Sequence, residues 1–253
     1  MLDPKASTVD LSVAGRDFTL AQSPGVLQSD RSGGTTGAVV WRTSVRFAEW
    51  LASPTNVLCQ HGVLGEKSTV LELGSGISGL TACVLASKVA KFVATDQQYA
   101  LKMLRSNIDA NLSSASRSKK ASRNQPSPEN SVDVLPLDWE TDDVPSFLST
   151  NGLGSGVDVV LTSDCIYNYA LIEPFTQACV DVCRVRQSLE DMEGKLISTL
   201  CIIAQQLRQP DVLEQWLEAF LLKFRVWRLP STLLDEALGE NSGFCVHIAV
   251  LLG

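Results

Sequence analysis

Apolar and polar residues alternate near the amino terminus of this chain. Every second residue is apolar between residues 9 and 13 and again between residues 18 and 20, and Ala14-Gly15 separates the two runs. A period of two on both sides of a glycine-bearing turn predicts a small β-hairpin. The chain therefore opens with a β extension.

Beyond this hairpin, short apolar runs alternate with segments of helical periodicity. The helical segments run from Thr43 or Ser44, either of which could cap the helix, to near Pro54, and then over 98–112, 171–185 and 212–224. The predicted strands are 69–73, 91–96, 132–137, 157–163, 196–204, 226–229 and 244–252. Strands that alternate with helices predict an α/β fold with a mostly parallel sheet, covered by helices on both faces. The strand-rich carboxyl terminus predicts an added antiparallel hairpin.

A chain of 253 residues can bury one substantial core. We therefore expect a single α/β domain over residues 38–253, preceded by the β-hairpin extension and a loop over residues 1–37. Residues 113–131 are polar, rich in serine and without apolar periodicity. Such a segment predicts a mobile loop inside the domain.

Three glycines follow the predicted strand at 69–73. In Thr-Val-Leu-Glu-Leu-Gly-Ser-Gly-Ile-Ser-Gly-Leu they stand at positions 74, 76 and 79. This spacing is typical of a turn that holds a nucleotide, in which Gly79 lets the next helix approach the sheet. A dinucleotide enzyme needs the same glycines, and a purely structural turn is the other alternative. Glu72 favours a ligand with a cationic amino group, because a carboxylate there would repel a pyrophosphate.

The next predicted strand, 91–96, ends in an acidic residue. A carboxylate at this place, Asp96, can accept both hydroxyls of a ribose. The alternative is that Asp96 caps the helix that follows from Gln97. The interval from the glycine turn favours the ribose.

Two more acidic motifs follow later strands. Asp138-Trp139 comes after the strand at 132–137, where the acid could accept a hydrogen bond from an adenine amino group and the ring could stack on it, although tryptophan is often only core. Ser163-Asp164 ends the next strand, and Tyr167 follows three residues after the acid. An acid and a phenol at one sheet edge can bind and orient an amine. The structural alternative is a helix cap by Asp164 and a packed Tyr167.

Composition narrows the class of protein. The formal net charge is −7, which favours a basic protein partner over direct binding of nucleic acid. The seven cysteines include no CxxC pair and only two histidines accompany them, so we expect reduced core thiols and no metal site. No secretion signal or membrane-spanning run is apparent, which predicts a soluble protein of the cytoplasm or nucleus.

Five motifs in order make the chain resemble a known family. They are Trp41 in GAVVW, then LELGSGISGL, ATD, LDW and SDCIYN. This set resembles the seven-β-strand S-adenosyl-L-methionine-dependent protein-lysine methyltransferases with a D-x-x-Y motif, and within them the fungal ribosomal lysine N-methyltransferase branch. The resemblance covers residues 16–253. It implies a Rossmann-like class I methyltransferase fold with a seven-stranded sheet, S-adenosylmethionine as cofactor, and a large-subunit ribosomal protein as substrate of a monomeric enzyme.

The resemblance also implies a role for each matching residue. Trp41 would close over the cofactor, and Asp164 with Tyr167 would handle the target lysine. The remaining cofactor-binding positions are Glu72, Gly74, Ser75 and Gly76 for the methionine portion, Asp96 for the ribose, Asp138 and Trp139 for the adenine, and Ser163 near the fourth strand. Three alternatives stay open: a methyltransferase of RNA or a small molecule, a nicotinamide oxidoreductase, and a non-catalytic scaffold that binds the cofactor.

Overall fold

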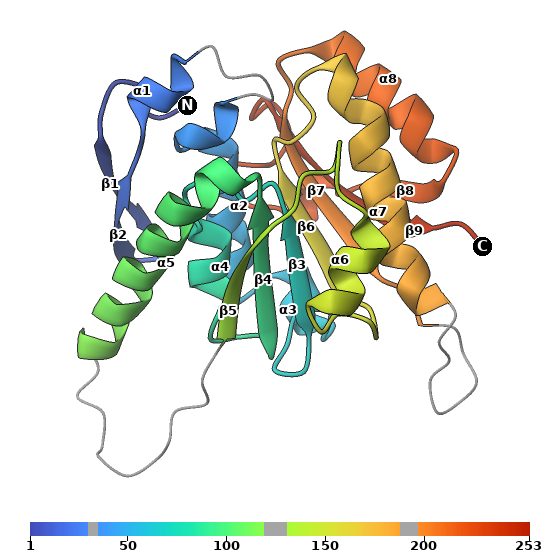
Figure 1. Cartoon of the computed structure of the whole chain (residues 1–253), viewed down its shortest axis with the longest axis horizontal. Coiled ribbons are helices and arrows are strands. Elements are labelled where there is room, and N and C mark those ends of the chain that lie inside the picture. The colour runs from blue at the N-terminus through green and yellow to red at the C-terminus, as the bar shows by residue number, and fades with distance from the viewer. Residues whose placement is uncertain (30–34, 119–130, 188–196) are drawn as a thin grey trace.

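The fold is built around one seven-stranded sheet (Figure 1). The computed structural model describes residues 1–29, 35–118, 131–187 and 197–253. In spatial order the strands are β5 (Ser131–Pro136), β4 (Lys91–Asp96), β3 (Thr69–Leu73), β6 (Val159–Ser163), β7 (Leu200–Gln206), β9 (Phe244–Leu251) and β8 (Phe224–Arg228). The strands from β5 to β7 are parallel, and β9 is antiparallel to both of its neighbours. The predicted sheet and its carboxyl-terminal hairpin are confirmed.

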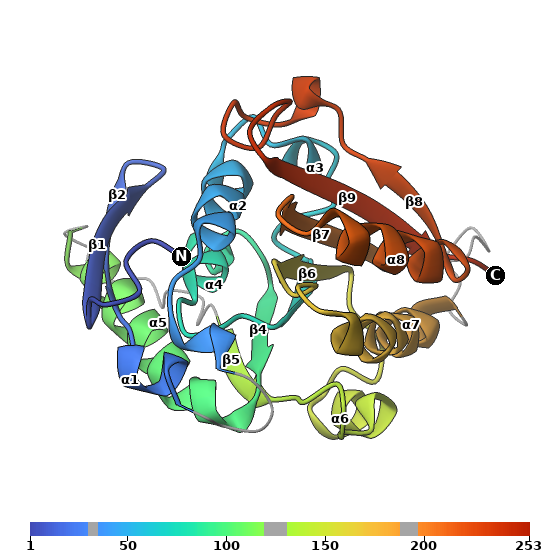
Figure 2. The same cartoon turned by 90° about the horizontal axis from the view of Figure 1, so that it is seen from above.

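Helices cover both faces of the sheet (Figure 2). One layer contains α2 (Arg42–Ala52), α4 (Leu80–Leu85) and α5 (Gln98–Ser118), and the other contains α6 (Val144–Thr150), α7 (Ile172–Gln187) and α8 (Pro210–Leu221). Successive strand residues point to opposite layers, so Val70 and Phe92 pack in the first core while Leu71 and Val93 pack in the second. Both faces being buried explains why the parallel strands are almost entirely apolar. Shorter helical pieces are α1 (Pro24–Leu27), α3 (Val57–Gln60), η1 (Thr36–Ala38), η2 (Tyr169–Leu171) and η3 (Ser231–Leu233).

The amino-terminal hairpin is part of the same core. Strands β1 (Thr8–Val13) and β2 (Arg16–Ala21) pair as predicted and lie beside α5 (Figure 1). Phe18 and Leu20 are buried in the core of the first helical layer. Two amide side chains of α5 accept hydrogen bonds from β2, from Thr19 N at 3.2 Å and from Ala21 N at 2.9 Å. The hairpin is therefore packed against the domain that follows it.

Several predicted boundaries were wrong, among them the end of the helix predicted over 212–224, because α8 ends at Leu221 and β8 begins at Phe224. Helix α2 begins at Arg42 without a side-chain cap, because Thr43 is buried and the Ser44 hydroxyl lies 2.9 Å from that of Ser163. Helix α5 continues through Ser118 and β5 begins at Ser131, so these ends of the predicted loop over residues 113–131 belong to regular elements. Residues 119–130 lie outside the described residues. Within the described ranges, no helix combines the length and apolar character that crossing a membrane requires.

Candidate functional site

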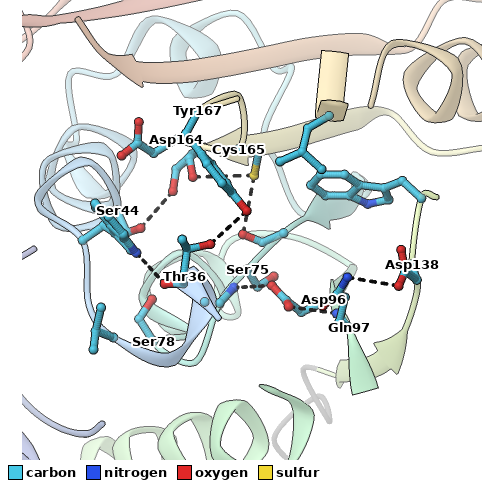
Figure 3. Close-up of a pocket in the computed structure, with 18 of the residues that line it drawn as sticks. Thr36, Ser44, Ser75, Ser78, Asp96, Gln97, Asp138, Asp164, Cys165 and Tyr167 are labelled. Atoms are coloured by element: carbon cyan, nitrogen blue, oxygen red, sulfur yellow. Dashed lines mark hydrogen bonds between the residues drawn. The ribbon is translucent and has the colours of Figure 1, made fainter. Parts of the chain in front are cut away.

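A pocket lies at the carboxyl ends of β3, β4, β5 and β6 (Figure 3). It holds about 840 Å³ of space free of protein atoms, part of it open to solvent. The structure brings ten of the predicted site residues to its wall: Trp41, Gly74, Ser75, Gly76, Asp96, Asp138, Trp139, Ser163, Asp164 and Tyr167. Motifs that are more than a hundred residues apart in sequence thus share one cavity.

The glycine turn after β3 forms one wall of the pocket. Gly74 has a φ of +69°, and a Cβ atom there would lie 2.5 Å from the Cys165 sulfur and 3.1 Å from the Trp139 ring. Only glycine fits this position. Gly79 also has a positive φ, but its close neighbour is Ile108 of α5, 2.4 Å from an added Cβ. The predicted role of Gly79 in helix–sheet packing was therefore wrong, since it lets α4 and α5 approach each other.

Asp96 links the two motifs that were predicted to bind a nucleotide. Its carboxylate accepts hydrogen bonds from Gly76 N and from Gln97 N, each at 2.8 Å. The acid thus holds the glycine turn as well as the start of the segment that leads into α5. Burial raises the pKa of Asp96 to about 6, although both hydrogen bonds act to lower it. Each oxygen retains a second lone pair that a ligand hydroxyl could use.

Glu72 does not line the pocket. The structure places it under the turn, 3% exposed, where its carboxylate accepts a hydrogen bond from the Ser75 hydroxyl at 2.8 Å. Burial raises the pKa of Glu72 to about 7, against the opposing effect of hydrogen bonds from Ser75 and Thr81. Its contact with a cofactor amino group stays a prediction, and the present geometry supports the turn instead.

The raised pKa makes the stability of the protein depend on pH through Glu72. Because the folded pKa is above the unfolded value of 4.5, the stabilising contribution is complete below pH 4.5 and is lost as pH rises through 7. Glu72→Gln cannot titrate. We expect the free energy of unfolding of the variant, relative to that of the wild type, to rise by about 3 kcal/mol between pH 4.5 and pH 8. Urea denaturation at four pH values measures this, and a difference that is constant with pH would contradict it.

Trp139 and Asp138 form the end of the pocket nearest β5. The Trp139 ring meets Phe175 edge-to-face, with 5.6 Å between ring centroids, and its buried Nε1 has no hydrogen-bond partner among the described residues. The Asp138 carboxylate accepts a hydrogen bond from the Gln97 side chain at 3.0 Å. A flat apolar surface flanked by an acceptor and an unused donor suits a planar heterocycle.

Asp164 stands at the opposite end, after β6. It has a φ of +59°, and its carboxylate accepts a hydrogen bond from Gln206 N at 3.3 Å and pairs with Arg208 Nη2 at 3.0 Å. Burial raises the pKa of Asp164, an effect that Arg208 opposes. Asn168, and not Asp164, caps the short helix that follows, by accepting a hydrogen bond from Leu171 N at 3.2 Å. The predicted helix cap by Asp164 is therefore wrong.

Tyr167 is held by the segment that precedes α2. The Thr36 hydroxyl donates to the Tyr167 oxygen at 3.0 Å, and Trp41 Nε1 donates to the Thr36 carbonyl at 2.7 Å (Figure 3). Burial raises the pKa of Tyr167 above its usual value, which keeps the phenol protonated near neutral pH. The hydroxyl thus stays available as a donor in the pocket.

Several pocket residues gave no recognised signal in the sequence. They come from outside the five motifs: Thr36, Ser44, Gln97, Tyr99, Glu140, Leu171 and Arg208. Thr36 belongs to a polar loop without periodicity. Arg208 follows β7, the neighbour of β6, so the rule that parallel strands end at one edge could have placed it near Asp164.

The strand order, the glycine turn after β3 and the acid that ends β4 define a Rossmann-like methyltransferase. Two solved structures share this fold. A SAM-dependent methyltransferase from Streptococcus mutans is 11% identical with a TM-score of 0.53, covering 98% of this chain and 56% of that one. A methyltransferase complexed with SAH is 11% identical with a TM-score of 0.52, covering 97% and 56%.

Sequence similarity narrows this class to one family. The profile of a family described as "Lysine methyltransferase" matches residues 22–189, and this chain belongs to that family. Its methyl donor is accordingly S-adenosylmethionine, as predicted. "Ribosomal lysine N-methyltransferase 5" of Zygosaccharomyces rouxii is 32% identical, over 83% of this chain and 72% of that protein. The Lachancea thermotolerans protein of the same name is 27% identical, over 83% and 75%.

One further relative is only partly covered. "Diaminohydroxyphosphoribosylamino-pyrimidine deaminase" of Schizosaccharomyces pombe is 32% identical over 89% of this chain, but the chain spans only 47% of that protein.

Proposed function

We propose that this chain is a protein-lysine N-methyltransferase that modifies a large-subunit ribosomal protein. Membership of the lysine methyltransferase family supports the reaction. Relatives that bear the name ribosomal lysine N-methyltransferase support the class of substrate, and the net charge of −7 suits a basic partner. The observation that carries the proposal is that Asp164 and Tyr167 line the same pocket as the glycine turn.

The residues of the pocket fit S-adenosylmethionine. The missing Cβ of Gly74 leaves room between the turn and Trp139, and the buried Trp139 Nε1 lacks a protein partner. In the proposed arrangement Trp139 and Asp138 hold the adenine, Asp96 holds the ribose, and the backbone at Gly74 to Gly76 holds the methionine portion. Trp41 covers the pocket and Ser163 lies beside the reacting end.

The target lysine must be neutral when it reacts. When bound, the cofactor would supply the methyl group of its positively charged sulfonium, whose sulfur–methyl bond breaks as the nitrogen–methyl bond forms and leaves a neutral thioether. A free lysine has a pKa of about 10.4, so its deprotonation at pH 7 costs roughly 4 to 5 kcal/mol. In the proposed mechanism Asp164 and the Tyr167 hydroxyl bind and orient the amine, and a water molecule accepts its proton.

This function can be tested with large ribosomal subunits from cells that lack the protein. The subunits are incubated with the purified chain and tritiated S-adenosylmethionine. We expect label in one ribosomal protein, and mass spectrometry should then find a methylated lysine that is absent from the mutant cells. Subunits from wild-type cells, already methylated, are the matched control and should accept little label. Label in ribosomal RNA, or in no macromolecule, would support the alternative substrates instead.

A further inference from the structure

The positively charged guanidinium of Arg208 pairs with the buried carboxylate of Asp164 in the pocket. Its Nη2 lies 3.0 Å from Asp164 Oδ2, and its guanidinium stacks over the Trp41 ring at 4.6 Å from the ring centre. The Asp164 side chain is 4% exposed and that of Arg208 is 29% exposed. Among the described residues that line the pocket, Arg208 is the only lysine or arginine. The lysine-binding end of the pocket therefore contains an ion pair.

A lone carboxylate beside the target lysine would oppose catalysis. It favours the charged ammonium and raises the pKa of the amine, whereas methyl transfer requires the neutral form. We propose that Arg208 is a positioning residue that neutralises the charge of Asp164, an inference that rests on the proposed function. The carboxylate can then orient the target amine without retaining the proton of the amine. A cation a few ångströms from the amine also lowers the pKa of the amine directly.

The ion pair is held by rigid parts of the fold. Asp164 follows β6 and Arg208 follows the adjacent β7, and Gln206 N donates to the second carboxylate oxygen at 3.3 Å. Stacking on Trp41 fixes the plane of the guanidinium. A carboxylate has about four acceptor positions. Among the described residues Gln206 N donates to Oδ1, whereas Oδ2 pairs with Arg208 without accepting a hydrogen bond, which leaves acceptor positions for a lysine N–H. Arg208 and a target amine can therefore share Asp164.

Other titratable or charged groups lie near the ion pair, but Arg208 is the cation that contacts Asp164. They are the Met1 amino group, Arg42 on α2, Cys165 and Tyr167 after β6, and Cys245 on β9. Burial raises the pKa of both thiols and of the phenol, so all three are neutral near pH 7. Burial lowers the pKa of the Met1 amino group, and nearby Arg208 and Arg42 lower it further.

Three variants separate the charge of Arg208 from its packing. The assay is tritium transfer from S-adenosylmethionine to ribosomal proteins of cells lacking this chain, with kcat and KM measured from pH 6 to pH 10. In Arg208→Gln the rise of kcat should move about one unit to higher pH, which lowers kcat about tenfold at pH 7 without raising KM. Arg208→Lys keeps the charge and should restore the wild-type pH profile. Arg184→Gln removes an exposed arginine of α7 and should change nothing.

A uniform loss of kcat at every pH in Arg208→Gln would overturn the proposal, and so would an Arg208→Lys profile that matches Arg208→Gln. A second measurement does not depend on a methyl acceptor. Carbon NMR of labelled aspartate, with Asp164→Asn to assign the signal, should show the Asp164 pKa at least about one unit higher in Arg208→Gln. An unchanged pKa rejects the role of Arg208, whereas a wild-type enzyme that methylates no ribosomal protein rejects the proposed function.

Discussion

Asp164→Asn should lower methyl transfer at least about a hundredfold, the range seen when a positioned polar group at a reaction centre is removed. The substitution removes the carboxylate that is proposed to orient the target amine and keeps the size of the side chain. Asparagine also tolerates the φ of +59° at this position, whereas alanine would add backbone strain. Asp164 lies across the pocket from Asp138 (Figure 3), so affinity for S-adenosylhomocysteine should stay within about twofold.

Steady-state transfer of tritium and calorimetric titration of S-adenosylhomocysteine measure the two effects. Asp133→Asn is a matched control, because Asp133 is a half-exposed acid on β5 that pairs with Lys91. This control should retain wild-type activity. Loss of both activity and cofactor-product affinity in Asp164→Asn would assign Asp164 to the structure of the pocket and not to the lysine.

Gly74→Ala should abolish cofactor binding and destabilise the fold by about 2 to 4 kcal/mol. Part of the cost, about 1 kcal/mol, is the positive φ. The rest comes from overpacking, since the added Cβ would meet the Cys165 sulfur at 2.5 Å and the Trp139 ring at 3.1 Å. Cys165 has little freedom to move, being buried with its sulfur 3.3 Å from the Leu73 carbonyl. Urea denaturation and titration with S-adenosylhomocysteine report the two losses.

Gly15→Ala separates the two causes. Gly15 has a φ of +72°, close to that of Gly74, but no atom lies within 4 Å of its added Cβ. It should therefore lose only about 1 kcal/mol and keep full cofactor affinity. If both variants are destabilised equally, the tight contact around Gly74 is not the reason that glycine is required there.

The strands of the sheet could be predicted because each of them is encoded by a local sequence pattern. Each buried parallel strand is a short apolar run, and the acids that follow the strands necessarily meet at one edge. Glu72 shows the limit of this rule. Leu71 and Leu73 point into the core beneath α7, so the two-residue period turns Glu72 toward the other layer and away from the pocket. Attention to that period would have placed it correctly.

Other parts of the site depend on long-range contacts that no local pattern encodes. Thr36 reaches Tyr167 across 131 positions, and Arg208 reaches both Trp41 and Asp164. A polar loop residue and a solitary arginine look the same in sequence whether they face solvent or a cavity. The prediction for the start of α2 was wrong for a related reason, because the Ser44 hydroxyl contacts the Ser163 hydroxyl instead of capping the helix.

The continuity of the pocket has a consequence for inhibitor design. Trp139 and Asp96 line the same cavity as Asp164 and Tyr167. A single molecule that joins an adenosine to an alkylamine could therefore occupy both ends together. Because the second contact becomes intramolecular once the first has formed, such a bisubstrate compound should bind far more tightly than either fragment. Its alkylamine arm would also distinguish this enzyme from methyltransferases whose acceptor ends lack an acid and a phenol.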